Sequence, residues 1–335
     1  MKWQRRHGRH DLPWQKTRDP YRVWLSEIML QQTQVATVIP YYRRFLARFP
    51  TIGALANAPL DEVLREWSGL GYYSRARNLH RAASEIVERH KGSFPRESES
   101  IIALPGIGRS TAGAIAVFAF GDARAILDGN VKRIFARCFG IHGYPGKREV
   151  EAKLWRTAEG LLPKKNVQAY TQGLMDLGAT ICLRGKPRCT ECPLARRCIA
   201  LSSNRIGELP AARPRRPLRE CRTEMLLLLR DGAVMLERRP PTGVWAGLWC
   251  LPQIPDRVDI AAVCERNYGA KVEALGVLPA FSHGFTHFTL HIRPRRYRVT
   301  KLIPRAESPS HIWLPVKEAL GAAIPAPVRR ILQLL

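Results

Sequence analysis

Residues 104–130, LPGIGRSTAGAIAVFAFGDARAILDGN, decide the fold of the first half of the chain. The stretch opens with two glycines one residue apart, Gly106 and Gly108, set among apolar residues. Glycine adopts positive φ easily and lets another molecule approach its bare backbone. An Ala-rich segment follows from Arg109, so the pattern predicts a glycine turn at the N-terminus of a helix, where backbone N–H groups attract anions.

A short helix is predicted just before this turn, over residues 97–103. A helix, a glycine-rich hairpin and a second helix form an arrangement that holds a DNA phosphate without reading base sequence. An ordinary turn between two helices fits the same five residues, and the turn alone leaves both interpretations open.

The stretch ends at Asp128-Gly129-Asn130, and another helix is predicted over residues 131–138. An Asp-Gly turn with a helix cap explains this pattern without any catalytic role. A second carboxylate of interest is Glu27, in a helix predicted to start at Asp19-Pro20. Glu27 lies beside an apolar helix face, where desolvation would raise its pKa, although a solvated helix edge is the commoner place for a glutamate.

Composition narrows the class of protein. The chain has 335 residues, enough for two domains, with 54 Lys and Arg against 28 Asp and Glu, a formal charge of +26. Such an excess favours a polyanionic partner, above all nucleic acid. The absence of any apolar run of about 18 residues predicts no membrane span. The first residues lack the apolar core of a signal peptide.

Two further segments have the composition of DNA contacts. Residues 31–34 are a polar amide cluster between two apolar helices, and amides can read base edges. Residues 69–77 contain two Gly, two Tyr and two Arg, which suits a loop that inserts an aromatic ring into a base stack. Core tyrosines in a helix turn are the alternative for this loop.

Four of the eight cysteines are clustered at Cys182, Cys189, Cys192 and Cys198, and the other four are scattered. This is no disulfide framework, and it predicts a reducing, cytoplasmic location. Four thiols so close together indicate a metal centre, with zinc as the default for a CxxC pair and an iron–sulfur cluster as the alternative.

The pattern changes after a Pro- and Arg-rich linker at residues 204–220. Beyond it we expect strands at 223–229, 233–237, 244–251, 271–278, 286–292 and 296–300, with helices at 260–268 and 326–334. This order predicts a separate α+β domain.

The chain resembles the helix-hairpin-helix DNA glycosylase superfamily, and within it the adenine DNA glycosylases. The resemblance rests on LPGIG at 104–108, WLSEIMLQQTQVAT at 24–37, GLGYYSRARNLH at 69–80 and ILDGNVKR at 126–133. The cysteine spacing resembles the 4Fe–4S loop of that superfamily, and the last domain resembles a Nudix fold without the acidic metal-binding run of Nudix hydrolases. The resemblance implies a multidomain protein: an all-α glycosylase domain at 1–203 with its iron–sulfur loop at 182–198, the linker, and a Nudix-like α+β domain at 221–335.

The resemblance also implies the activity, which is hydrolytic removal of adenine mispaired with 8-oxoguanine or guanine in double-stranded DNA. Its catalytic positions match Glu27 as general acid, Asp128 as the carboxylate facing the sugar, and Asn130 as an orienting group. The adenine pocket matches Trp14 and Gln172. The DNA-contacting positions match Gln32, Thr33, Leu70, Tyr72, Gly106, Gly108, Ser110 and Lys132.

Two departures from the superfamily matter. Lyase members carry a lysine where this chain has Ser110, which argues against efficient strand cleavage, although Lys132 is a nearby amine. The Phe-Ser-His tripeptide that reads 8-oxoguanine matches Phe285-Thr286-His287 when the following residues are aligned, although Phe281-Ser282-His283 is the literal match.

Three other functions are weighed against this one. A glycosylase-lyase for oxidised pyrimidines conflicts with the serine at Ser110. A non-catalytic iron–sulfur DNA-binding protein would not need the two carboxylates, and a nucleotide pyrophosphatase would need the acidic run that is missing. We expect a monomer on duplex DNA at the nucleoid, with no membrane association.

Overall fold

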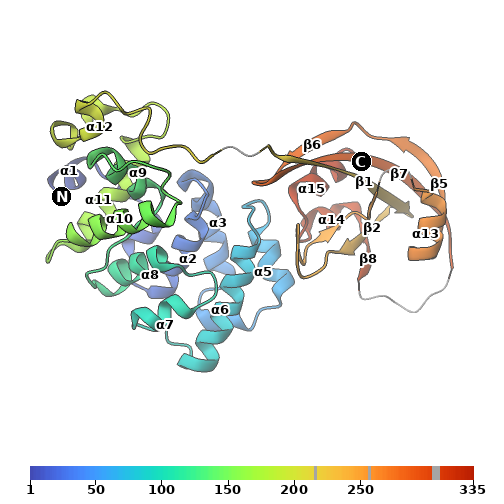
Figure 1. Cartoon of the computed structure of the whole chain (residues 1–335). Helices are drawn as coiled ribbons and strands as arrows, with labels where there is room; N and C mark the ends of the chain where they lie inside the picture. The colour runs from blue at the N-terminus through green and yellow to red at the C-terminus, as the bar shows by residue number, and fades with distance from the viewer. Residues whose placement is uncertain (215–216, 256–257, 304–309) are drawn as a thin grey trace. The chain divides into compact units, whose positions relative to one another are not determined.

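The computed structural model describes residues 1–335 except 215–216, 256–257 and 304–309 (Figure 1). The chain divides into two compact units, residues 1–57 with 78–215, and residues 58–77 with 216–335. The predicted division into 1–203, 204–220 and 221–335 therefore differs at residues 58–77, which group with the C-terminal unit. Two residues of the predicted linker, 215–216, lie outside the described part of the chain.

The first unit is helical (Figure 1). Its α-helices, in chain order, are α1 (Lys2–His7), α2 (Pro20–Leu30), α3 (Val35–Arg48), α4 (Ile52–Ala56), most of α6 (Ser74–His90), α7 (Ser98–Ala103), α8 (Arg109–Ile115), α9 (Gly129–Cys138), α10 (Arg148–Gly160), α11 (Val167–Thr180) and α12 (Ile199–Ser202). Within the described residues, no helix is long and apolar enough to cross a membrane.

Helix α2 forms where the sequence predicts it. The Asp19 carboxylate accepts the backbone N–H of Tyr21 at 2.9 Å, and Pro20 occupies the first helical position. Trp24 and Leu25 are fully buried, and burial of each such side chain contributes about 1.5–3 kcal/mol to folding. The helix that carries Glu27 is thus fixed in the core of the first unit.

The sequence also predicts a single helix over residues 55–70, and this prediction is wrong. The chain forms α4 and then α5 (Leu60–Trp67), with a break at Pro59. Proline disfavours helical backbone at the residue before it, so α5 begins only after Pro59. Helix α5 belongs to the second unit.

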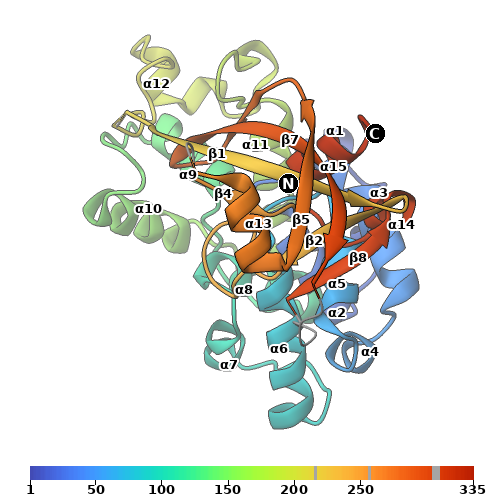
Figure 2. The same ribbon diagram turned by 90° about the vertical axis from the view of Figure 1, so that its right-hand side faces the viewer.

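The second unit contains one mixed eight-stranded sheet with the order β3-β2-β1-β7-β5, to which β4, β6 and β8 add as side pairs (Figure 2). The strands are β1 (Arg219–Arg230), β2 (Ala233–Arg238), β3 (Trp249–Cys250), β4 (Gln253–Ile254), β5 (Ala270–Val277), β6 (Phe281–Gly284), β7 (Phe288–Leu302) and β8 (His311–Pro315). β1 and β7 are parallel, and the other pairs are antiparallel.

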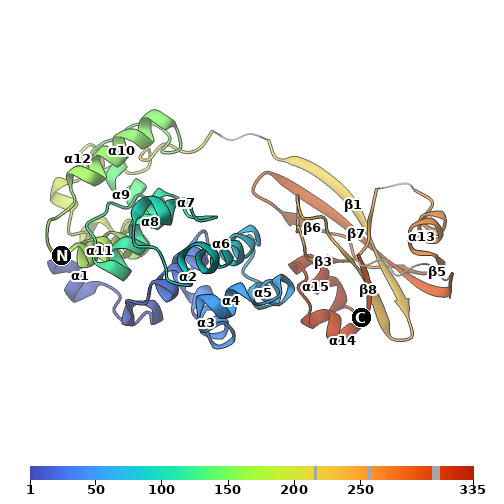
Figure 3. The same ribbon diagram turned by 90° about the horizontal axis from the view of Figure 1, so that it is seen from below.

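Both faces of this sheet are covered by helices (Figure 3). Successive side chains of a strand point to opposite faces. Met225 and Leu227 of β1 pack in a cluster with α14 (Val316–Gly321) and α15 (Ala326–Leu332). Leu226 and Leu228 pack instead with α13 (Ile260–Tyr268). Two-sided burial explains why the β1 sequence is a continuous apolar run.

Two strand predictions in this unit are wrong. The strands expected at 286–292 and 296–300 are one strand, β7, which continues through Pro294. The strand expected at 244–251 is reduced to β3, because Gly243, Trp245 and Gly247 have φ of 85°, 55° and 73° and turn the chain. Elements β4, β6, β8, α1 and α14 were not predicted.

Candidate active site

The glycine turn lies between α7 and α8, as predicted. Its apolar residues Leu104, Pro105 and Ile107 are buried, whereas Gly106 and Gly108 are exposed. Gly106 has φ of 79°, and a Cβ there would lie 2.9 Å from Cβ of Asn78, so no larger residue fits without a shift. The buried side chains anchor the turn and present the glycine backbone at the surface of the unit.

Asp128 stands at the N-cap of α9. Its Oδ1 accepts the backbone N–H of Val131 at 2.8 Å. The preceding Leu127 donates its N–H to Oγ of Ser110 at 2.9 Å, which ties the approach to Asp128 to the start of α8. In the sequence, a helix cap and a catalytic carboxylate are alternative roles for Asp128. In the structure, Oδ1 caps the helix and the second oxygen, Oδ2, is left for another partner.

The carboxyl groups of Glu27 and Asp128 interact electrostatically, although they come from α2 and α9. Burial, and secondarily the charge of Asp128, raises the pKa of Glu27 to about 8. Burial also raises the pKa of Asp128, but the N–H groups of Val131 and Asn130 and the charge of Arg133 oppose that rise. Glu27 thus holds a proton at neutral pH, and Asp128 has the donors that stabilise a negative charge.

The Glu27→Gln variant is expected to gain thermal stability relative to the wild type as the pH rises. The pKa of Glu27 is raised in the folded protein from its ordinary value of 4.5 to about 8. Its contribution to stability is therefore fully present below a pH of about 4.5 and is lost as the pH rises through about 8. Glutamine stays neutral throughout. Melting temperatures measured from pH 5 to 9 should show a gap that widens with pH and levels off above about 8. A gap independent of pH would contradict the raised pKa.

The turn that carries Asp128 is connected to the cysteine loop through Arg133. The guanidinium donates to Oδ1 of Asn130 at 2.9 Å, to the carbonyl of Gly178 at 2.7 Å and to the carbonyl of Cys182 at 2.6 Å. Asn130 also packs directly on Gly178, where a Cβ would lie 2.4 Å from that of Asn130. Asn130 therefore holds its turn against α11 through Arg133.

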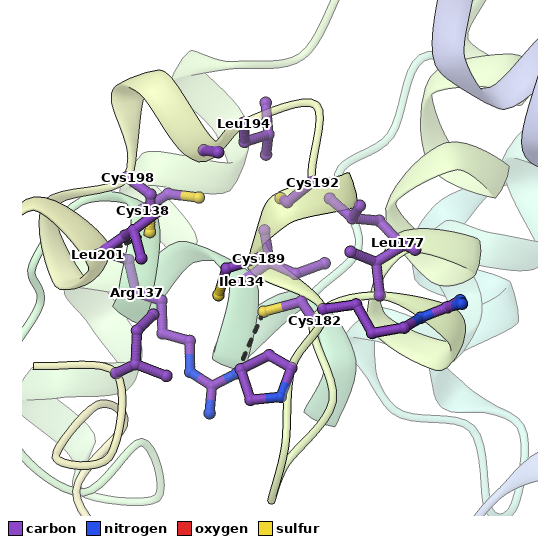
Figure 4. A pocket seen from close by; sticks show the side chains of 15 residues that line it. Ile134, Arg137, Cys138, Leu177, Cys182, Cys189, Cys192, Leu194, Cys198 and Leu201 are labelled. Carbon is purple, nitrogen blue, oxygen red and sulfur yellow. Dashed lines mark hydrogen bonds between the residues drawn. The ribbon is translucent and has the colours of Figure 1, made fainter.

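The four clustered cysteines line one pocket (Figure 4). Apolar side chains of Ile134, Leu177, Ile181 and Leu194 complete much of its wall. Arg137 also lines the pocket, is only 3% exposed, and donates to Sγ of Cys182 at 3.3 Å. Its other donors reach the carbonyls of Leu183, Arg184 and Leu209. A buried guanidinium needs acceptors for its N–H groups, and these carbonyls and the Cys182 sulfur supply them.

The lining of this pocket fits an iron–sulfur cluster, because it offers four cysteine sulfurs and mainly apolar walls. Within the described ranges, no group of three or more His, Cys, Asp or Glu side chains converges closely enough to hold a metal ion. The four thiols instead line a single pocket together with largely apolar side chains. Zinc requires sulfurs within about 2.3 Å of one point, whereas the irons of a 4Fe–4S cluster are spread over a larger body.

Lys132, Trp14 and Gln172 each contact a neighbouring side chain, and their predicted roles toward DNA and adenine stay predictions. Nζ of Lys132 lies 2.6 Å from Oε1 of Glu151. Trp14 is buried, with its ring edge-on to that of Tyr42 at 5.4 Å between centroids. Nε2 of Gln172 donates to Oδ1 of Asp176 at 2.8 Å.

Four residues predicted to contact DNA lie in two loops, one in each unit. In the first unit, Gln32 is exposed with φ of 58°, and Thr33 is half-buried. In the second unit, Leu70 is buried, whereas Tyr72 is 46% exposed with φ of 49°. An exposed tyrosine on strained backbone is consistent with a role outside the core.

The C-terminal tripeptide lies in the turn between β6 and β7. Thr286 and His287 are exposed, and the ring of Phe285 stacks on Phe288 at 4.4 Å between centroids. The literal match, residues 281–283, is instead in β6, where Oγ of Ser282 is 2.9 Å from Nδ1 of His291.

Sequence reasoning missed three polar residues that organise the first unit: the buried Arg137 and Asp176, and the half-buried Arg133. Asp176 is fully buried and accepts from the backbone and side chain of Arg9 at 3.0 and 2.7 Å. For the two arginines, the available signal was that both follow Asp128 on one short helix, four residues apart.

Family models match both parts of the chain. The model of the HhH-GPD superfamily base excision DNA repair protein matches residues 25–159, and that of the NUDIX domain matches residues 224–334. These matches confirm the predicted fold class, a helical glycosylase domain followed by a Nudix-like domain.

Similar proteins cover nearly the whole chain. An adenine DNA glycosylase from Buchnera aphidicola subsp. Baizongia pistaciae is 38% identical over 99% of this chain and 94% of its own length. The one from Mus musculus is 33% identical over 97% of this chain and 75% of its own length. A solved thermostable thymine-DNA glycosylase has a TM-score of 0.56 and 31% identity, over 60% of this chain and 93% of its own. With identity of this extent, the chain belongs to the adenine DNA glycosylases of base excision repair, which hydrolyse N-glycosyl bonds.

Proposed function

We propose that this adenine DNA glycosylase acts on adenine paired with 8-oxoguanine or guanine in duplex DNA. It works as a monomer at the nucleoid of the cytoplasm, with hydrolysis as its main chemistry. The observation that carries the catalytic part is the carboxyl pair of Glu27, which holds a proton near neutral pH, and Asp128, which is supplied with N–H donors.

The two carboxyl groups divide the reaction between them. Adenine leaves slowly as an anion, so Glu27 donates its proton to N7 of the flipped-out base and assists departure. The sugar then becomes positively charged, and Asp128 stabilises that charge, as the second carboxylate does in glycoside hydrolysis. Asn130 keeps the Asp128 turn in place through Arg133. Trp14 and Gln172 bound the adenine pocket.

The DNA is held by backbone and loop contacts. The exposed turn at Gly106 and Gly108 binds phosphate through backbone N–H groups. Gln32, Thr33, Leu70 and Tyr72 contact the lesion and the opened base stack. Ser110 and Lys132 act near the strand, although the hydroxyl of Ser110 is already occupied as an acceptor for Leu127.

A single assay tests the substrate. Purified protein is incubated with end-labelled duplexes that contain adenine opposite 8-oxoguanine, adenine opposite guanine, or thymine glycol. Excision from the first two and none from the third is expected. Excision of thymine glycol at a comparable rate would point to a glycosylase for oxidised pyrimidines instead.

Borohydride trapping is expected to give little covalent adduct, and most nicks should require alkali. Ser110 supplies no amine, and Nζ of Lys132 is paired with the Glu151 carboxylate at 2.6 Å. The trapped fraction is read on a denaturing gel beside total excision. Adduct in proportion to total excision, lost in Lys132→Ala, would make Lys132 a lyase nucleophile.

The pocket of Cys182, Cys189, Cys192 and Cys198 would hold a 4Fe–4S cluster, which when bound crosslinks the loop they span. Protein purified without oxygen is expected to be brown and to contain about four iron atoms per chain. Elemental analysis measures iron and zinc in the same sample. Zinc without iron would overturn the assignment.

A further inference from the structure

A fifth cysteine lies at the pocket of the four clustered ones. Cys138 is the last residue of α9, far earlier in the chain than Cys182, and its side chain lines the same pocket (Figure 4). Its side chain lies within electrostatic range of three of the four predicted ligands, Cys198, Cys182 and Cys192, which line the same pocket. The site therefore offers five sulfurs to a group that needs four.

Of the four predicted ligands, Cys198 is the one that Cys138 could replace. Both side chains line the pocket, and Sγ of Cys198 donates to the carbonyl of Arg137, the residue directly before Cys138, at 3.6 Å. Both are held by packed elements, because Ile134 and Phe135 anchor α9 in the core and Cys198 caps α12 against it. The two cysteines are thus brought to the same part of the pocket by elements that pack together.

We propose that Cys138 is a reserve ligand that can replace Cys198 at the iron–sulfur cluster. This inference rests on the proposed cluster. In the exchange, Sγ of Cys138 binds the iron and the bond from Cys198 breaks. The proton of the Cys138 thiol passes to the Cys198 thiolate. Four thiolates bind the cluster before and after, so the exchange needs no oxidant or reductant.

The competing interpretation is that Cys138 only fills space, since free cysteine commonly behaves as a small buried apolar residue. A space-filling residue would affect the cluster equally whether or not Cys198 is present. A reserve ligand matters only when Cys198 is lost, so the effects of the two substitutions would not add.

The experiment compares iron per chain and visible absorbance in five full-length proteins purified without oxygen. These are the wild type, Cys138→Ser, Cys198→Ser, the double variant, and Cys189→Ser as matched control. The thiols facing Cys189 belong to Cys182 and Cys198, which are already ligands. We expect Cys138→Ser and Cys198→Ser to keep most of about four iron atoms, and the other two variants to fall below about one.

Two results would overturn the proposal: loss of iron in Cys198→Ser as complete as in Cys189→Ser, or equal iron in Cys198→Ser and the double variant. If ligand variants fail to fold, iron release to a chelator is timed in the wild type and Cys138→Ser, which both keep four ligands. Faster release from Cys138→Ser is expected, and equal rates would overturn the proposal. A wild type without iron would instead refute the proposed cluster itself.

Discussion

The Glu27→Gln variant should release adenine about 10²–10⁴ times more slowly than the wild type, because glutamine cannot donate the proton that the leaving base needs. In the wild type, the excision rate should fall as the pH rises through about 8, since the pKa of Glu27 is about 8 and ionisation removes the acid. Single-turnover excision across this pH range measures both effects.

Asp128→Asn should cause a loss of about 10²–10³-fold, the usual cost of removing a group that stabilises transition-state charge. Asparagine caps helices as well as aspartate does, so the bond to Val131 N and the start of α9 are retained. The loss therefore reflects the missing charge rather than unfolding.

Two matched controls accompany these variants. Glu99→Gln makes the same change on the exposed surface of α7, and Asp19→Asn makes the same change at the N-cap of α2. Both should excise at the wild-type rate, and all four variants should bind duplex with similar affinity. Near-normal excision by Glu27→Gln or Asp128→Asn would remove that residue from the mechanism.

The second large effect is expected for His287→Ala, which should slow excision opposite 8-oxoguanine far more than opposite guanine. Thr286 and His287 are exposed at the β6–β7 turn, where a hydroxyl and an imidazole are available to a base edge. A good contact to a base contributes about 1–3 kcal/mol of discrimination, or about 5- to 150-fold in relative rate.

The matched control for this prediction is His283→Ala. The ring of His283 packs against Trp245 and Phe285, and burial lowers its pKa, so it remains a neutral part of an aromatic cluster. Its loss should leave the preference between the two mispairs unchanged. A larger effect at His283 would favour the literal tripeptide, residues 281–283, as the reader.

The dependence on salt distinguishes recognition of 8-oxoguanine from nonspecific electrostatic binding of DNA. Binding through charge alone weakens for every duplex as salt rises. If His287→Ala lowers excision of both mispairs equally, and the difference from the wild type vanishes at higher salt, then the turn acts only as an electrostatic clamp. Both mispairs should therefore be measured at two salt concentrations.

Local sequence determined the elements whose causes lie within a few residues. Asp19-Pro20 starts α2, the buried and exposed alternation of residues 104–108 builds the hairpin, and Asp128 caps α9. Capping and glycine turns depend on backbone geometry between near neighbours, so the sequence contains the information. Local pattern gave the wrong result at residues 286–300, where two short strands are predicted and one strand forms. Pairing with β1 continues β7 through Pro294.

Only the tertiary structure decided which distant groups meet. The sequence identifies Glu27 as a glutamate beside an apolar face, but its burial in the folded unit, and secondarily the charge of Asp128, is what raises its pKa. Nothing in the sequence marks Arg133 and Arg137 as interior residues, yet folding half-buries Arg133 and fully buries Arg137 against the carbonyls and sulfur of the cysteine loop. Cys138, one of the scattered cysteines, joins the clustered four only in the folded chain. Desolvation and charge pairing depend on which segments pack together, and that is a property of the whole fold rather than of any local stretch.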